Sequence, residues 1–138
     1  MKYAFVLLSF IVLLGCDQEQ ESTVLDGVWR SDKELTVQNF SVNSKLTPAR
    51  KDFLENNLGK LYISFRGNET RVFFDDVPEK EVEAQSFKVI LNDDEKIVIT
   101  VHSEDYGRNT ITYYWIDDCI YMIQKEWGYS EYFCREDT

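Results

Sequence analysis

Histidine, cysteine and basic residues are scarce in this chain of 138 residues. It has one His and three Cys, too few for most zinc sites, which bring three or four such ligands together. Lys and Arg number 15 against 25 Asp and Glu, giving a formal net charge of −10 at pH 7. Nucleic-acid binding requires Lys and Arg to neutralise phosphates. We therefore expect no metal, no resident cofactor and no nucleic-acid partner.

Long apolar runs are also missing, apart from one at residues 4–14. That run is shorter than the roughly twenty apolar residues that a membrane-spanning helix needs. It follows Lys2 and precedes the small residue Gly15. A basic residue, a short apolar run and a small residue are typical of a secretory signal peptide.

The residues Leu13-Leu14-Gly15-Cys16 resemble the bacterial lipobox. In that family signal peptidase II cleaves before the cysteine, whose thiol receives a diacylglycerol and whose amine is usually acylated. The resemblance implies a signal peptide at residues 1–15 and a lipid anchor on Cys16, followed by a polar tether that ends at residue 23. Several acyl chains anchor a protein stably, since each buried CH₂ contributes about 0.8 kcal/mol.

Asp17 and Gln18 follow the cysteine. In enterobacterial lipoproteins this pair resembles the signal that retains a protein in the inner membrane. We therefore expect a lipid-anchored protein of the bacterial cell envelope at the periplasmic face of the inner membrane, with the outer membrane as the alternative.

Apolar residues mostly alternate across residues 24–138, which predicts half-buried strands in a single domain. Thr47-Pro48 predicts the start of a helix and Gly59 its end, with Phe53, Leu54 and Leu58 on its buried face. Strands are expected at residues 24–29, 35–42, 61–66, 70–74, 87–91, 97–101, 110–116, 119–125 and 129–135. The fold class is mainly β. We expect a single antiparallel meander barrel of about eight strands with one short helix after the second strand, and a two-layer sandwich is the alternative.

Cys119 and Cys134 fall on the last two expected strands, almost opposite each other. In an oxidising envelope they are the natural disulfide pair, because lipid would occupy Cys16. A redox-active pair is the alternative, but its usual Cys-x-x-Cys spacing is missing.

Gly27-Val28-Trp29 resembles the Gly-x-Trp opening of the lipocalin and wider calycin families. In those folds the first-strand Trp packs across the bottom of the barrel beside an Arg from the last strand. The resemblance therefore implies a barrel-closing cation–π pair between Trp29 and Arg135, in a small lipocalin-like lipoprotein. The chain lacks a Thr-Asp-Tyr motif and has no helix after the last expected strand.

Side chains with catalytic potential are few. His102 is the lone histidine, at the end of an expected strand, and no nucleophile signature such as Gly-x-Ser-x-Gly occurs. Paired acidic residues occur at Asp75-Asp76, Asp93-Asp94-Glu95, Glu104-Asp105 and Asp117-Asp118. Most of these fall at expected turns, where Asp is favoured for backbone reasons, and none has the spacing of a calcium loop. We expect no enzymatic activity and assign no catalytic residue.

Aromatic residues crowd the last third of the chain, and alternation must place some of them outside the barrel. Exposed aromatic rings are good anchors for a partner. We therefore expect binding of one of two kinds. Either a lipocalin-like barrel holds a small apolar ligand or envelope component, near residues such as Ile99, or an acidic and aromatic outer face captures a basic protein partner. For the second kind, in the manner of an inhibitor or immunity protein, Asp117-Asp118 and Glu131 are expected on that outer face.

Overall fold

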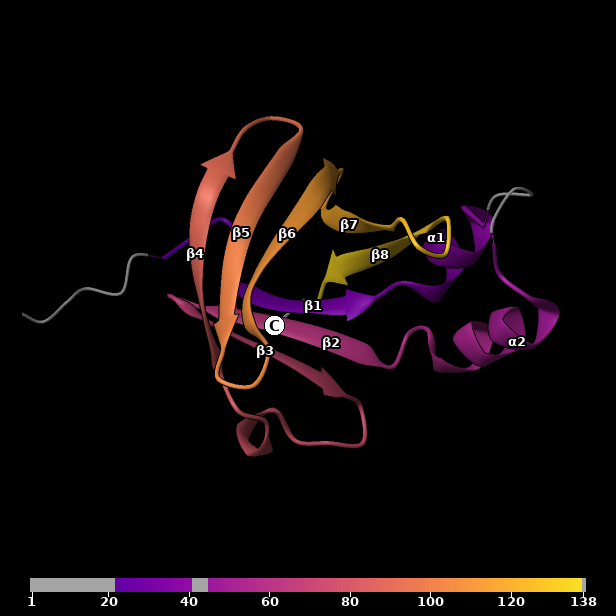
Figure 1. Cartoon of the computed structure of the whole chain (residues 1–138), viewed down its shortest axis with the longest axis horizontal. Helices are drawn as coiled ribbons and strands as arrows, with labels where there is room; N and C mark the ends of the chain where they lie inside the picture. The colour runs from indigo at the N-terminus through magenta and orange to yellow at the C-terminus, as the bar shows by residue number, and fades with distance from the viewer. Residues whose placement is uncertain (1–21, 41–44, 138) are drawn as a thin grey trace, which may run out of the picture.

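The computed structural model describes residues 22–40 and 45–137. Cys16 and Val42 lie outside these ranges. The described helices contain none that is long and apolar enough to cross a membrane. The elements are β1 (Gly27–Ser31), α1 (Lys33–Gln38), α2 (Pro48–Asn57), β2 (Leu61–Arg66), β3 (Glu69–Phe74), η1 (Glu79–Glu81), β4 (Gln85–Asn92), β5 (Lys96–Ser103), β6 (Gly107–Ile116), β7 (Cys119–Gln124) and β8 (Tyr129–Arg135) (Figure 1).

The eight strands form a closed antiparallel barrel in which each strand pairs with the next and β8 pairs back to β1. The expected meander barrel is therefore confirmed. Figure 1 shows β4, β5 and β6 crossing the strands of β1, β2 and β3 steeply, so the barrel is strongly flattened into two sheets. The sheets meet at corners with short pairing: β3 pairs with β4 only at Glu69 and Thr70, and β6 pairs with β7 only from Tyr114 to Ile116.

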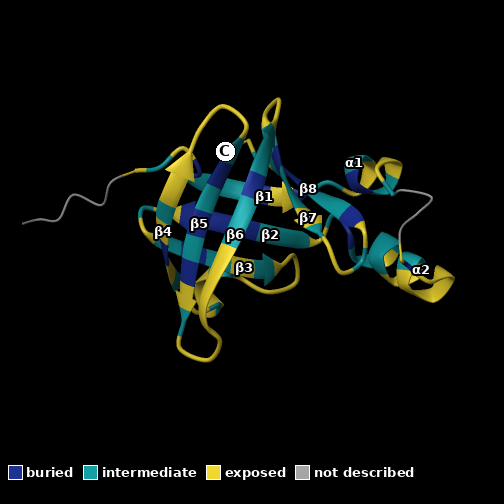
Figure 2. Cartoon of the chain, turned by 45° about the horizontal axis from the view of Figure 1, so that its top comes forward, coloured by how far each residue is buried: buried dark blue, intermediate teal, exposed yellow. Residues whose placement is uncertain are grey.

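Apolar side chains fill the space between the two sheets. Ile97, Ile99 and Ile120 have no exposed surface, and the Phe65 ring makes edge contacts with Phe87 and Tyr113 from the opposite sheet. The dark bands in Figure 2 mark these buried positions along the strands. The core consists of Leu25, Trp29, Ile63, Phe65, Phe87, Ile97, Ile99, Val101, Tyr113, Ile120 and Phe133.

The expected second strand at residues 35–42 is wrong, because residues 33–38 form the helix α1. Asp32 caps this helix by accepting a hydrogen bond from the Leu35 amide at 2.8 Å. Thr36 is fully buried, and its hydroxyl accepts a hydrogen bond from the Tyr132 amide at 3.0 Å. The helix thus covers β8 just where its ladder with β1 ends.

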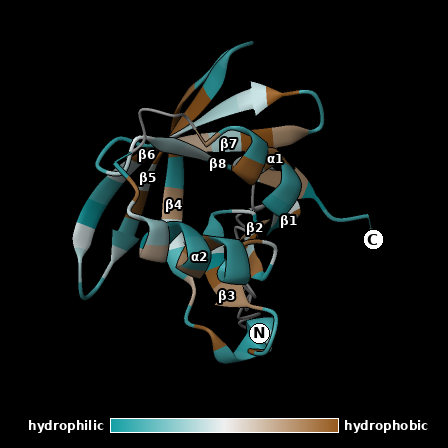
Figure 3. Cartoon of the chain, turned by 90° about the vertical axis from the view of Figure 1, so that its right-hand side faces the viewer, coloured by the Kyte–Doolittle hydropathy of each residue, from teal (hydrophilic) through white to brown (hydrophobic). Residues whose placement is uncertain are grey.

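The expected helix at residues 48–57 is confirmed as α2, capped by Thr47 and followed by Gly59 with φ 84°. Of the three residues expected on its buried face, only Leu58, at the end of the helix, is buried, and Phe53 is 64% exposed. No residue within α2 itself is buried. The helix attaches instead through Arg50, whose guanidinium lies 3.4 Å from the ring centroid of Trp127. Figure 3 looks onto this end of the molecule, with α2 in the foreground.

Candidate functional site

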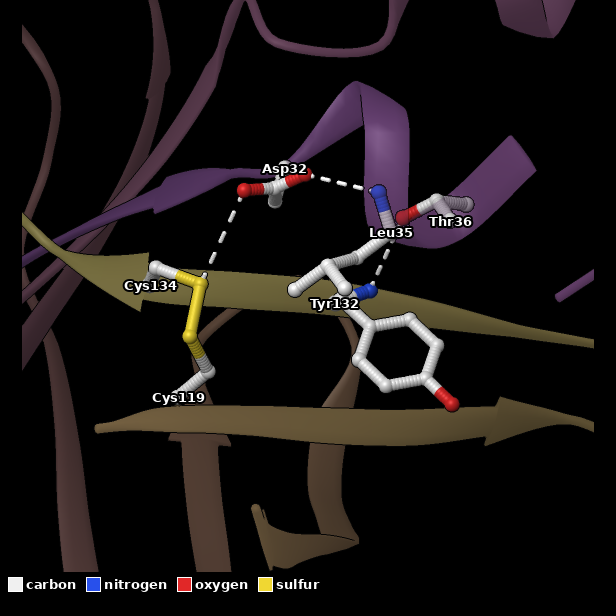
Figure 4. The surroundings of a disulfide bond; sticks show 6 residues. All are labelled: Asp32, Leu35, Thr36, Cys119, Tyr132 and Cys134. Atoms are coloured by element: carbon white, nitrogen blue, oxygen red, sulfur yellow. Dashed lines mark hydrogen bonds between the residues drawn. A yellow bond between two sulfur atoms is a disulfide. The ribbon is translucent and has the colours of Figure 1, made fainter. Parts of the chain in front are cut away.

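The predicted disulfide between Cys119 and Cys134 is confirmed. The two cysteines are directly opposite each other in the β7–β8 ladder. Figure 4 shows the bond beside the start of α1, where one carboxylate oxygen of Asp32 lies 3.8 Å from the Cys134 Sγ and the other caps the helix. The disulfide therefore fastens β8, on which α1 rests, to β7.

The predicted pair of Trp29 and Arg135 is brought together by the β1–β8 ladder, in which the two residues are direct partners. The Arg135 guanidinium carbon lies 4.4 Å from the centroid of the Trp29 ring. The same guanidinium donates hydrogen bonds to the carbonyls of Asp26 and Val24, and the Trp29 indole donates to the Leu25 carbonyl at 2.7 Å. These contacts close one end of the barrel.

Gly27 explains the first residue of the Gly-x-Trp motif. Its φ of 132° lies in a region that residues with a Cβ rarely adopt. A Cβ at this position would also lie 3.0 Å from an Arg135 guanidinium nitrogen. Glycine is therefore needed here both for its backbone conformation and for the close approach of Arg135.

Charged side chains gather around a surface hollow of about 400 Å³ between the β3–β4 corner and the β5–β6 turn. Four carboxylates line it, from Glu69, Glu83, Glu104 and Asp105, and no Lys or Arg is among its lining residues. Among the described residues, only Glu69 of these four forms an ion pair, with Arg71 at 3.3 Å. The hollow is thus a concentrated source of negative potential. We call it the acidic hollow.

The β5–β6 turn shapes one wall of the acidic hollow. The Ser103 hydroxyl accepts a hydrogen bond from the Tyr106 amide at 3.1 Å, and Gly107 has φ 69°. This turn leaves the Tyr106 side chain 79% exposed. His102, also exposed, lines the hollow as well. An exposed tyrosine beside unpaired carboxylates is suited to contact a basic protein surface.

Other acidic groups have the turn role that was expected. The Asp93 carboxylate accepts hydrogen bonds from the amides of Glu95 and Lys96, each at 2.9 Å. These hydrogen bonds lower the pKa of Asp93. Asp117 adopts φ 47° at the β6–β7 turn, and Asp118 is exposed beside it. No three His, Cys, Asp or Glu side chains converge as a metal site within the ranges that the structure describes.

Glu131 does not lie on the outer face as expected. It is directly opposite Met122 in the β7–β8 ladder, and it alternates with Tyr129 and Phe133, which are both buried. Burial raises the pKa of the Glu131 carboxyl, although hydrogen bonds with Gln124 and Ser31 counter part of this effect. Period-two alternation from Phe133 would have predicted this inward position.

The inward carboxylate of Glu131 affects the pKa values of two tyrosines. Burial, followed by the Glu131 charge, raises the pKa of Tyr113, and the same two causes raise the pKa of Tyr129 to about 12. On the outer face a second group of tyrosines stacks across neighbouring strands, with ring centroids 5.1 Å apart from Tyr114 to Tyr121 and from Tyr121 to Tyr132. The aromatic residues of the last third therefore divide between the two faces.

Comparison with known proteins gives no match: no family model, no curated protein and no solved structure matches this chain. The closed barrel of eight antiparallel strands is compatible with a calycin-like fold.

Proposed function

We propose that this chain is a small lipocalin-like lipoprotein of the bacterial envelope, anchored through Cys16, that acts without catalysis by capturing a basic protein partner. The observation that carries the choice of partner is the acidic hollow, with its four carboxylates and no lining cation. Complementary charge speeds association and selects among partners. A partner with exposed Lys and Arg fits this surface.

The packed interior supports a protein partner over a small apolar cargo. An eight-stranded barrel is just wide enough for side chains to fill it or for one small ligand. Here eleven buried residues form one cluster across the barrel, and rings of opposite sheets are in contact. A ligand at the centre would have to displace them.

The lipid anchor rests on the lipobox resemblance of residues 13–16. A chain with net charge −10 is repelled by anionic lipid. Acyl chains on Cys16, rather than surface charge, would therefore hold the domain at the membrane and leave its acidic face for the partner.

Charge reversal at the acidic hollow tests this function. Glu104→Lys/Asp105→Lys changes two exposed residues of the β5–β6 turn. We expect a basic protein to co-purify with the unmodified full chain after cross-linking in its own envelope. The variant, treated in the same way, should lose most of that protein. The control Asp75→Lys/Asp76→Lys makes the same change in charge at exposed positions after β3 and should retain that protein. Equal capture by both variants would overturn the assignment of the partner to the acidic hollow.

A further inference from the structure

The Cys119–Cys134 disulfide has a charged neighbour whose position is fixed by two elements. One carboxylate oxygen of Asp32 lies 3.8 Å from the Cys134 Sγ (Figure 4). The other oxygen accepts the hydrogen bond from the Leu35 amide at 2.8 Å, at the start of α1. The Asp32 amide in turn donates to the Tyr132 carbonyl of β8 at 2.8 Å. Asp32 is therefore held by α1 and β8 together, with one oxygen directed at the sulfur.

The charge of Asp32 is not balanced by a neighbouring cation. The ion pairs of the described residues do not include Asp32. Arg30 is the direct partner of Cys134 in the β1–β8 ladder, but its guanidinium is engaged elsewhere. It donates to the Gly59 carbonyl at 2.7 Å and lies 3.7 Å from the Glu136 carboxylate. The Cys134 sulfur therefore has a negative charge as its neighbour.

This negative charge opposes both routes by which a thiol can open the disulfide. A thiolate attacks one sulfur, a new S–S bond forms, and the other sulfur leaves as a thiolate that takes up a proton. If the attack is on Cys134, the incoming thiolate must approach Asp32. If the attack is on Cys119, the departing thiolate forms on Cys134, beside Asp32. Like charges at this separation repel, so both routes are slowed.

We propose that Asp32 protects the Cys119–Cys134 bond from exchange with thiolates, in addition to capping α1. Reactive cysteine pairs have the opposite surroundings, because a cation or a helix N-terminus stabilises their thiolate. Here α1 begins close to the sulfur, but Asp32 accepts the hydrogen bond of its Leu35 amide. Capping alone needs no charge, since Asn or Ser caps a helix about as well as Asp. The charge is the feature that the protection requires.

Removal of the charge without loss of the cap tests this inference. In the full chain, purified in mild detergent, dithiothreitol should reduce the disulfide of Asp32→Asn roughly tenfold faster than that of the unmodified chain. Dithiothreitol supplies both electrons and is oxidised to its cyclic disulfide. Alkylation of the freed thiols, followed by mass spectrometry of the peptides that contain Cys119 and Cys134, measures the rate. Glu34→Gln, the matched control, removes an exposed charge from the first turn of α1 and should be reduced at the unmodified rate.

An uncharged reductant separates charge repulsion from a loosening of α1. The phosphorus of tris(hydroxypropyl)phosphine can attack the Cys134 sulfur and become cationic, while the thiolate leaves on Cys119, the sulfur farther from Asp32 (Figure 4). Water then converts the phosphonium to the phosphine oxide and releases the second thiol. Asp32 does not oppose this route, so the phosphine should reduce Asp32→Asn no faster than the unmodified chain. A loosened α1 would instead speed reduction by both reagents.

A second uncharged cap, Asp32→Ser, covers the case in which Asp32→Asn fails to fold, and it should be reduced as fast as Asp32→Asn. Reduction of an uncharged variant by dithiothreitol at the unmodified rate would overturn the inference. So would slower reduction, which would make Asp32 a promoter of exchange, or an equal acceleration by the phosphine. The inference is independent of the proposed capture of a basic protein, which none of these rates measures.

Discussion

Arg135 and Trp29 are direct partners in the β1–β8 ladder, with the guanidinium carbon 4.4 Å from the ring centroid. The same guanidinium donates hydrogen bonds to two backbone carbonyls, those of Val24 and Asp26, which precede β1. One side chain of the last strand thus holds both the first strand and the segment leading into it. The closure of the barrel depends on this arrangement.

Loss of the Arg135 guanidinium should destabilise the domain. We expect Arg135→Gln to lower the free energy of unfolding by about 2 kcal/mol, since it removes a cation–π contact and two hydrogen bonds. Urea unfolding followed by tryptophan fluorescence measures the change. Arg108→Gln, at an exposed position of β6, is the control and should have little effect. Equal stability of the two variants would show that the pair does not close the barrel.

The disulfide should contribute much of the stability of β7 and β8. It closes a sequence separation of 15 residues, which corresponds to about 3 kcal/mol in the chain-entropy view. We expect Cys119→Ser/Cys134→Ser to lower the free energy of unfolding, measured by urea titration, by this amount. Dithiothreitol should destabilise the unmodified chain to the same level and leave the double variant unaffected. An unfolding midpoint insensitive to dithiothreitol would contradict the prediction.

The inward carboxylate should make stability depend on pH in an unusual direction. The pKa of Glu131 is raised in the folded state, so the folded state binds its proton more tightly than the unfolded state does. This group therefore destabilises the fold above its folded pKa, and the penalty fades as the pH falls toward the ordinary glutamate value of about 4.3. Glu131→Gln should be more stable than the unmodified chain at pH 7.

Unfolding of both proteins across this pH range separates the effect of Glu131 from those of other groups. The stability difference between Glu131→Gln and the unmodified chain should shrink steadily with acidification. Glu126→Gln, an exposed neighbour in sequence, serves as the control and should shift stability little at any pH. A Glu131→Gln variant that is less stable than the unmodified chain at pH 7 would contradict the burial argument.

Enlarging an interior side chain should disrupt the barrel. Ile99 is fully buried, so Ile99→Trp has no space to occupy and should cost roughly 1–3 kcal/mol or prevent folding. Thermal unfolding by circular dichroism measures this loss. Ile90→Trp, at a position that is 58% exposed, should be tolerated. Unchanged thermal stability of Ile99→Trp would indicate a hollow barrel able to hold cargo.

Most strands were predictable because two signals coincide along this chain. Alternating apolar residues set the strands, and turn residues such as Gly67, with φ 62°, and Asp117 set their ends. The helix α2 was predictable from its cap, Thr47, and its early proline. These are local features, so a single sequence contains them.

The failed predictions depend on contacts between distant parts of the chain. Leu35 and Val37 alternate like strand residues, but Thr36 bonds to Tyr132, far along the sequence, and stabilises a helix there. Phe53 was expected on a buried face of α2 but is 64% exposed, and the helix attaches through the contact of Arg50 with Trp127. The acidic hollow joins residues of the β3–β4 corner to the β5–β6 turn. The sequence assigned Glu104 and Asp105 to a turn and gave no sign that they meet Glu69 and Glu83.

Native mass spectrometry of the full chain, released gently from its own envelope in mild detergent, tests most directly whether the domain binds a protein or a cargo. We predict a complex with a basic protein that dissociates as the salt concentration rises and that is weakened in Glu104→Lys/Asp105→Lys. A reproducible small-molecule adduct that persists in this variant, with no protein bound to the unmodified chain, would contradict the proposed capture of a basic partner.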